Sequence, residues 1–160
     1  MSLTAGDRLP NAQLMVMRDG APQTVTSHEL ALGRRTVWFA VPGAFTPTCS
    51  VKHLPSFVEC ADAIKAKGVD EIFCIAVNDP FVLGAWKDAE DADSIVMVSD
   101  GNGAFASAMG LELNVSRFGM GTRSQRYAMV VDGLGVITAL GVEPGLGVTV
   151  SGAQAILEEL

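Results

Sequence analysis

The chain has 160 residues, of which 49% are hydrophobic and 18% are charged, and its formal net charge is −7. This length and composition predict a single soluble globular domain spanning residues 1–160. The acidic balance argues against a nucleic-acid partner, and the absence of a long apolar run argues against a membrane span.

The chain has three cysteines, an odd number that is too small for a structural disulfide framework. No His/Cys cluster has the spacing of a metal site, so neither a metal nor another cofactor is expected. The N-terminal segment lacks the basic and apolar regions of a secretory signal. The cytoplasm is therefore the expected compartment.

Hydrophobic periodicity predicts strands and helices that alternate along most of the chain. In order, we expect a hairpin of strands 11–18 and 23–25, a short helical turn after Thr26 or Ser27, a buried strand 36–41, a long helix ending at residues 67–68, a strand 71–77, a helix 80–88, a strand 94–98, a helix 104–109, a loop 111–124, a hairpin of strands 127–131 and 135–140, and a helix 152–159 capped by Ser151. This order indicates an α/β domain whose sheet is parallel in the middle and antiparallel at one edge.

One cysteine occupies an unusual position in this pattern. Residues 42–49, Pro-Gly-Ala-Phe-Thr-Pro-Thr-Cys, join the buried strand to the long helix through a rigid turn. Cys49 therefore lies in the first helical turn, where free N–H groups and the helix dipole stabilise a thiolate. The alternative interpretation is that Cys49 is a small buried hydrophobic residue.

Residues 42–49 also resemble the active-site loop of the peroxiredoxins, which are thiol peroxidases of thioredoxin-like fold. The family motif is Pro-x-x-x-Thr-x-x-Cys, and the Gly-Ala-Phe-Thr-Pro filling followed by Ser50 and residues 53–55 (His-Leu-Pro) is similar to the type II, peroxiredoxin-5-like branch. Further similar segments are residues 67–72, 77–82 and 126–131, so the resemblance runs from about residue 6 to the C-terminus. It implies a mixed thioredoxin-like sheet flanked by helices, with an added N-terminal β-hairpin.

The resemblance implies reduction of hydrogen peroxide and small alkyl hydroperoxides, with Cys49 as the nucleophile that becomes a sulfenic acid. Thr46 would place its hydroxyl beside the sulfur, and Pro42 would shield the thiolate from water. Arg126 would supply the fixed cation. Thr48 and Phe118 are candidates for the substrate pocket.

Each supporting residue also has an ordinary structural interpretation. Thr46 could cap the following helix, Pro42 could simply end the strand, and Arg126 could be a solvated residue at a strand end. Arg123 is the alternative cation if the register is displaced by three residues. These alternatives stay open at the level of sequence.

His53 lies four residues after Cys49 and raises a rival interpretation, a Cys-His hydrolase or acyl transferase. No Asn or Asp is obviously placed to orient this histidine. We therefore expect His53 to be a structural partner of the loop or a weak electrostatic neighbour of the sulfur.

A sulfenic acid needs a second thiol to resolve it. Cys60 would lie about 16 Å along the same helix, which is too far for a disulfide with Cys49. Several type II relatives resolve through a cysteine at the spacing of Cys74, whereas others use one within a C-terminal Gly-x-Thr-Cys-Ser stretch. Residues 147–151 here read Gly-Val-Thr-Val-Ser, with Val150 at that position.

Two routes therefore remain, resolution by Cys74 or by an external thiol, and Cys74 could also be only a packed strand residue. Thioredoxin or glutathione with glutaredoxin is the expected reductant. The resemblance also implies a homodimer joined near Phe45 and Phe81. The alternative function is a non-catalytic thioredoxin-like interaction or chaperone module that retains an inert motif.

Overall fold

The computed structural model describes residues 2–145 and 147–160. The strands are β1 (Gln13–Arg18), β2 (Ala21–Thr26), β3 (Thr36–Ala40), β4 (Glu71–Ala76), β5 (Val96–Ser99), β6 (Glu112–Asn114), β7 (Thr122–Ser124), β8 (Tyr127–Val131) and β9 (Ile137–Val142). The helices are α1 (Ser27–Ala31), α2 (Leu54–Ala66), α3 (Pro80–Ala89), α4 (Ala104–Met109) and α5 (Ala153–Glu158), with a π-helical turn η1 (Cys49–His53) and a 3-10 turn η2 (Ser116–Phe118).

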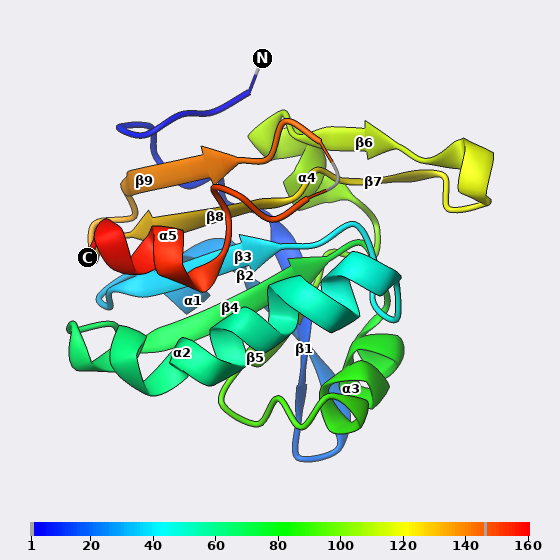
Figure 1. The fold of residues 1–160 in the computed structure, drawn as a ribbon, viewed down its shortest axis with the longest axis horizontal. Helices are drawn as coiled ribbons and strands as arrows, with labels where there is room; N and C mark the ends of the chain where they lie inside the picture. The colour runs from blue at the N-terminus through cyan, green and yellow to red at the C-terminus, as the bar shows by residue number, and fades with distance from the viewer. Residues whose placement is uncertain (1, 146) are drawn as a thin grey trace.

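Seven strands form one sheet in the order β2-β1-β5-β4-β3-β8-β9 (Figure 1). The central strands β3, β4 and β5 are parallel, β8 and β9 continue the sheet antiparallel on one side, and the β1–β2 hairpin joins β5 on the other. The predicted mixed sheet with an N-terminal hairpin is confirmed. The hairpin adds a second antiparallel edge, next to β5.

The hairpin turn follows directly from its sequence. Asp19 and Gly20 have φ values of 53° and 78°. Positive φ at both central residues gives a turn whose twist matches that of the flanking strands, and Asp-Gly is among the dipeptides that adopt it readily. The next predicted feature is also confirmed, because the Thr26 side chain accepts a hydrogen bond from the Glu29 N–H and caps α1.

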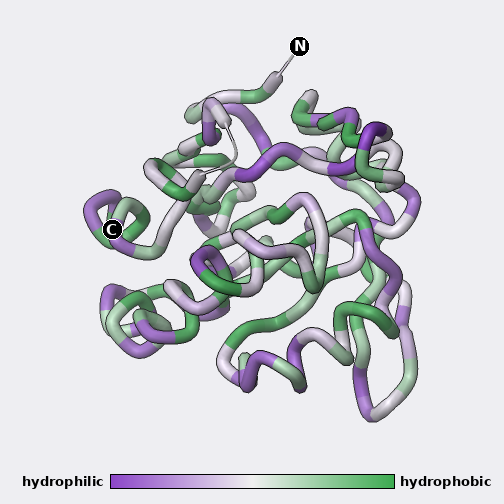
Figure 2. Tube along the Cα trace, turned by 45° about the vertical axis from the view of Figure 1, so that its right-hand side comes forward, coloured by the Kyte–Doolittle hydropathy of each residue, from purple (hydrophilic) through white to green (hydrophobic). Residues whose placement is uncertain are grey.

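The sheet is covered by helices on both faces, and the hydrophobic stretches of the chain meet between them (Figures 1 and 2). On one face α2, α3 and α5 pack over Phe39, whose ring stacks on Phe57 with centroids 4.0 Å apart. On the other face α1 and α4 pack over Trp38. Successive residues of β3 point to opposite faces and all five are buried, so the strand is apolar after its first residue, Thr36. No helix in the described part of the chain is long and apolar enough to cross a membrane.

Residues 111–124 differ from the prediction of a loop. They form a two-stranded antiparallel ribbon of β6 and β7, closed by η2 and by Gly119 and Gly121, both at positive φ. Each strand has only three residues, which is too short for a period-two pattern to stand out.

The predicted cap of the last helix is also wrong. The residue before α5 is Gly152, and the hydroxyl of Ser151 donates instead to the carboxylate of Glu143. The α5 N-terminus is satisfied from another helix, because the Ala153 N–H donates to the Ser56 hydroxyl. Ser151 thus belongs to a different network, which reaches the Cys49 site.

Candidate active site

The loop that carries Cys49 is fixed at several points. The Ala44 N–H donates to the side-chain oxygen of Asn78 at 2.9 Å, and Phe45 adopts a positive φ of 63°. The guanidinium of Arg123 lies against Gly43, where a Cβ would approach its Nη1 to 2.8 Å. Arg123 Nη1 also donates to the carbonyl of Pro42 at 3.2 Å. Arg123 therefore holds the loop, and the glycine leaves room for it.

Cys49 itself begins a π-helical turn at the N-terminal end of α2. The Leu54 N–H donates to the Cys49 carbonyl, five residues back, which widens the helix by one residue. The indole N–H of Trp86 in α3 donates to the Ser50 hydroxyl at 3.0 Å and ties the turn to a neighbouring helix. Cys49 and His53, the two ends of the turn, are both fully buried.

Arg126 brings its positive charge to the sulfur. Its Nη2 donates to Cys49 Sγ at 3.1 Å, and its Nη1 donates to His53 Nδ1 at 2.8 Å. The buried Nε–H has no hydrogen-bond partner among the described residues. Of the two candidate arginines, Arg126 contacts the sulfur and Arg123 supports the loop.

His53 is locked as a neutral ring by its two partners. Its Nε2 lies 2.8 Å from the carbonyl of Ser151, which can only accept, so Nε2 carries the proton. Nδ1 then accepts from Arg126. Burial and the adjacent Arg126 charge together lower the pKa of His53 to about 3. The nitrogen that a general base would use is occupied by Arg126, which argues against the Cys-His hydrolase.

Thr46 and Pro42 both line the approach to the sulfur. The Thr46 hydroxyl donates to the Gly43 carbonyl at 2.6 Å, so its lone pairs remain free to accept a hydrogen bond. Thr46 makes no side-chain capping bond at the start of the helix. Pro42 is half-buried and lines the same pocket as Thr46 and Arg126.

An open, largely apolar pocket of about 460 Å³ lies over these residues. The β6–β7 ribbon forms its far wall. The lining residues are Pro42, Thr46, Pro47, Thr48, Leu113, Val115, Phe118, Met120 and Arg126. The two pocket candidates from sequence, Thr48 and Phe118, therefore both lie in its wall.

The other two cysteines lie outside this pocket. Cys74 is fully buried in β4, opposite Phe39 of β3, in the same apolar cluster as Cys49. Burial raises the pKa of the Cys74 thiol well above its usual value, and a charge on Cys49 raises it further. Cys60 lies on α2, where Gln154 Nε2 approaches its sulfur at 3.7 Å.

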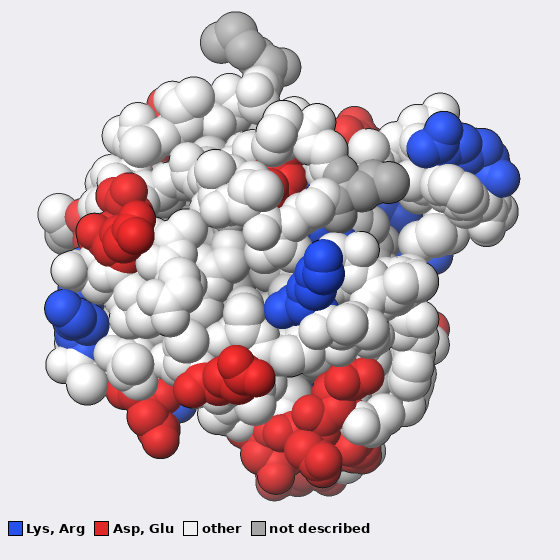
Figure 3. All heavy atoms as spheres, in the orientation of Figure 1, with Lys and Arg blue, Asp and Glu red and all other residues white. Residues whose placement is uncertain are grey.

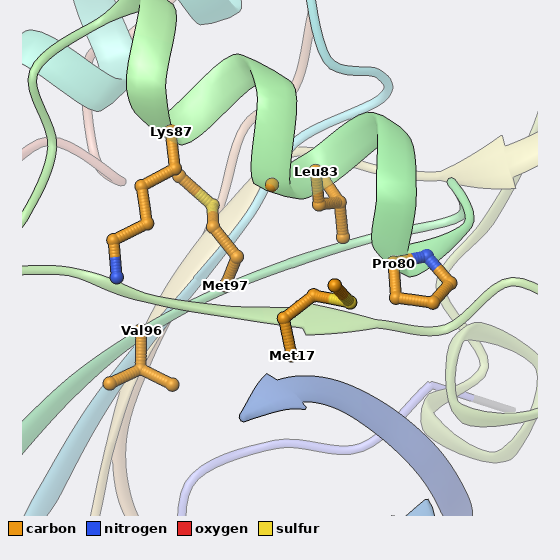
Figure 4. Close-up of a pocket in the computed structure, with 7 residues that line it drawn as sticks. Met17, Pro80, Leu83, Lys87, Val96 and Met97 are labelled. Carbon is orange, nitrogen blue, oxygen red and sulfur yellow. The ribbon is translucent and has the colours of Figure 1, made fainter. Parts of the chain in front are cut away.

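A second, smaller cavity of about 60 Å³ lies between α3 and the β1 and β5 strands (Figure 4). Its wall consists mainly of aliphatic and thioether side chains, including Met17, Leu83 and Met97. No residue of the Cys49 loop lines it. Residues 2–145 and 147–160 contain no group of three or more His, Cys, Asp or Glu side chains that could hold a metal ion.

Comparison with known proteins identifies this arrangement. Residues 4–157 match the redoxin family. Over 99% of its length the chain is 48% identical to peroxiredoxin-2E-2, chloroplastic, of Oryza sativa subsp. japonica, of which it covers 73%. The chain belongs to the peroxiredoxin family.

Two further peroxiredoxins match over nearly their whole length. Peroxiredoxin-2B of Arabidopsis thaliana is 44% identical over 99% of this chain and 98% of its own. The crystal structure of reduced Prx3 from Vibrio vulnificus in complex with H2O2 superposes with a TM-score of 0.93, at 47% identity and 98% coverage of both chains. The predicted thioredoxin-like fold and the peroxiredoxin-5-like branch are confirmed. The protein is a thiol peroxidase, and the non-catalytic module is not favoured.

Two residues of this peroxiredoxin site were missed from sequence, Glu143 and Ser151. Both lie about a hundred positions after Cys49, and they reach it through His53 rather than through a motif. The only sequence signal is a carboxylate, Glu143, directly after an apolar strand with no cation beside it. A buried carboxylate needs several hydrogen-bond donors, and that need points to the nearby Thr149-Val150-Ser151 segment.

Proposed function

We propose that this peroxiredoxin reduces hydrogen peroxide and small alkyl hydroperoxides at Cys49, with Arg126, Thr46 and Pro42 in support. The observation that carries the assignment is the 3.1 Å contact between Arg126 Nη2 and Cys49 Sγ beneath the apolar pocket. A guanidinium stays charged, so it favours the thiolate over the thiol. Thr48 and Phe118 would contact the organic part of the substrate.

In the proposed step the thiolate attacks one peroxide oxygen and the O–O bond breaks. The sulfur is oxidised to a sulfenic acid, and the second oxygen leaves as hydroxide or alkoxide and takes up a proton to give water or an alcohol. The Nε–H of Arg126, which has no hydrogen-bond partner in the described part of the chain, is available to donate to the oxygen on which charge develops. Thr46 Oγ1, whose own proton is engaged by Gly43, can accept the O–H of the peroxide.

Resolution of the sulfenic acid is proposed to follow one of two routes. Cys74 shares the apolar cluster with Cys49, but as a buried, protonated thiol it is a poor nucleophile until the first helix unwinds. An external thiol, glutathione with glutaredoxin or thioredoxin, would instead enter by the pocket. Either reductant requires a reducing compartment, which supports the cytoplasm as the proposed location.

We also propose a homodimer joined beside the active site. Phe45 and Phe81 leave 55% and 63% of their surface exposed, which is costly for a free aromatic side chain. Phe45 lies in the Cys49 loop and Phe81 in the first turn of α3. A partner that covers both would therefore also buttress the loop.

The test is mass spectrometry of the reduced protein after one equivalent of hydrogen peroxide, under native conditions and then as intact denatured chains. Loss of two hydrogens that maps to a Cys49–Cys74 disulfide would support internal resolution. An added oxygen on Cys49 that converts to a glutathione adduct would support the external route. The native spectrum reports the dimer directly.

A Cys49→Ser variant is the control, and its mass is expected not to change. If the mass of the native chain is also unchanged, the proposed peroxidase chemistry is wrong. A dominant monomer at micromolar concentration would contradict the proposed homodimer without affecting the chemistry.

A further inference from the structure

The residue that follows β9, Glu143, is a buried carboxylate tied to Arg126 through the backbone. Its side chain is 5% exposed, and its N–H donates to the carbonyl of Arg126 at 2.9 Å. Burial alone would raise the pKa of Glu143, but hydrogen bonds from Ser151, Thr149 and Val150 outweigh burial and lower the pKa to about 2. The carboxylate is therefore ionised at neutral pH.

Glu143 binds one short segment of the C-terminal loop. Its carboxylate accepts from Thr149 Oγ1 at 2.7 Å, from Ser151 Oγ at 2.6 Å, and from the N–H groups of Thr149, Val150 and Ser151 at 2.8 Å each. The same segment lies over β9 so closely that a Cβ at Gly141 would collide with the carbonyl of Val150. The position of Ser151 is thus set by a charged anchor.

Ser151 passes this constraint to the active site. It is fully buried, with its N–H and its hydroxyl both held by Glu143 Oε2, so its carbonyl has a fixed direction. That carbonyl accepts from His53 Nε2, and His53 Nδ1 accepts from Arg126 Nη1. Backbone and side-chain hydrogen bonds therefore form a closed ring that begins and ends at Arg126.

We propose that Glu143 and Ser151 are positioning residues that hold the guanidinium of Arg126 against Cys49 through His53. The inference rests on the proposed roles of Cys49 and Arg126. An arginine side chain has several soft torsions, and fixing it at both ends lowers the cost of placing its donors where charge develops.

The chemistry of the intermediate residue supports this role. A carboxylate in the place of His53 would also accept from Arg126, but it would neutralise the guanidinium and weaken its attraction for the thiolate. A neutral imidazole accepts the hydrogen bond and leaves the full positive charge facing the sulfur. The negative charge of Glu143 lies further from Arg126, beyond Ser151, and its carboxylate accepts hydrogen bonds from backbone N–H groups and hydroxyl groups.

The experiment measures how fast hydrogen peroxide oxidises Cys49 in a single turnover, by stopped-flow tryptophan fluorescence. Trp86 is a suitable reporter because its indole bonds to Ser50, next to the nucleophile. We expect Glu143→Gln to lower the second-order rate constant about 10- to 100-fold, the range found at metal sites when a residue that orients a metal ligand is lost. The pH–rate profile is expected to move to higher pH, because a loosened guanidinium stabilises the thiolate less well.

Two variants at His53 separate positioning from mere folding. His53→Leu cannot accept from Arg126 and is expected to match the loss in Glu143→Gln. His53→Asn places an amide oxygen near the Nδ1 position and is expected to recover part of the rate. In the double variant Glu143→Gln/His53→Leu the two losses are expected not to multiply. Both substitutions break the same ring of hydrogen bonds, so the second has little left to remove.

Asp100→Asn is the matched control. Asp100 is also a buried carboxylate that accepts from two backbone N–H groups, those of Phe105 and Ala106, but it lies on α4's side of the sheet. We expect this variant to lose stability while keeping a rate constant within about 2-fold of the native value and an unmoved pH profile.

Independent, multiplicative losses in the double variant would overturn the proposal, as would a native rate in folded Glu143→Gln. If Glu143→Gln does not fold, His53→Leu opens the ring at its other side, and a native rate and pH profile in that variant would overturn the proposal equally. A native protein that does not react with peroxide would instead refute the proposed function. Native reactivity with unaffected variants would refute only the positioning role.

Discussion

At the scale of single residues, the positive charge beside the sulfur and the hydrogen-bond acceptors around it come from different side chains. Arg126 is the cation beside the sulfur, and its buried partner, His53, is neutral, so the charge is not cancelled. Thr46 has its proton engaged by Gly43 and its lone pairs free. Arg126 is thus able to donate to the reacting atoms and Thr46 to accept from them, which is the combination that a peroxide O–O–H group needs.

This division predicts the behaviour of Thr46→Val. Valine keeps the β-branched shape but cannot accept the O–H of the peroxide, so we expect the rate constant for hydrogen peroxide to fall about 100-fold, within the range found for a lost catalytic hydrogen bond. Alkylation of Cys49 by iodoacetamide needs no such acceptor and is expected to change less than about 3-fold. Stopped-flow oxidation and timed alkylation measure the two rates.

Two further variants show whether the effect of Thr46→Val comes from the lost hydroxyl. Thr46→Ser keeps the hydroxyl and should restore most of the peroxide rate, while Thr138→Val removes a threonine hydroxyl on β9, remote from the sulfur. Equal losses of oxidation and alkylation in Thr46→Val would mean that the threonine shapes the loop rather than binding peroxide.

At the scale of elements, the sequence predicts what depends on neighbours along the chain and misses what depends on distant partners. The order of strands and helices, the Asp19-Gly20 turn and the Thr26 cap all follow from local patterns. The π-turn does not, because one displaced hydrogen bond from Leu54 to Cys49 leaves the hydrophobic period of the helix unchanged. The sequence predicts Ser151 as the cap of the last helix because the partner of its hydroxyl, Glu143, follows the end of β9 and is not adjacent in sequence.

The β6–β7 ribbon is the clearest example of a missed functional element. Residues 111–124 carry no periodic pattern, yet Leu113, Val115, Phe118 and Met120 form one wall of the pocket over Cys49. Phe118 alone was anticipated there, by resemblance and not by periodicity. Short strands are stabilised by pairing and by packing against neighbouring side chains, neither of which is visible in a window of sequence.

Because the ribbon lines the pocket over Cys49 but does not contact the sulfur, we expect Phe118→Ala to change specificity. Phe118 is 60% exposed, so its removal costs little stability, but it takes away apolar surface next to an organic hydroperoxide. We expect KM for cumene hydroperoxide to rise about 5- to 10-fold, equivalent to roughly 1 kcal/mol, with hydrogen peroxide reduction changed less than about 2-fold. Steady-state kinetics with both peroxides measure the ratio.

Leu134→Ala is the matched control for Phe118→Ala. Leu134 is another exposed apolar side chain, 73% accessible, in the turn between β8 and β9. The specificity ratio in that variant should equal that of the native protein. A parallel decline with both peroxides in Phe118→Ala would show that the ribbon supports the catalytic loop instead of the substrate.

At the scale of the whole molecule, the charges are divided between an acidic surface and a buried polar ring. Acidic side chains gather near α2 and α3 on the face seen in Figure 3, whereas basic ones are scattered over the β6–β7 ribbon, the centre of the face and its left edge. The ring of Arg126, Glu143, Ser151 and His53 crosses the interior beside the apolar cluster of α2 and α5. Folding must therefore bury an ionised carboxylate and a neutral histidine together, and both become harder to bury in acid.

The last prediction concerns acid stability. The pKa of His53 is lowered from 6.5 to about 3 by burial and by Arg126, so the unfolded chain binds a proton below pH 6.5 that the folded chain refuses. The free energy of unfolding should thus fall by up to about 1.4 kcal/mol for each pH unit below 6.5.

The pKa of Glu143 is lowered from 4.5 to about 2 by its hydrogen bonds, although burial opposes this, so stability is lost further between those values. Urea unfolding followed by circular dichroism between pH 7 and pH 4.5 measures this slope, and comparison with histidine variants isolates the His53 contribution. The slope should persist in His28→Asn, because that variant leaves His53 and its partners unchanged, and it should disappear in His53→Asn. A slope that survives in His53→Asn would assign the acid sensitivity to the carboxylates and would contradict the neutral, buried histidine on which the ring depends.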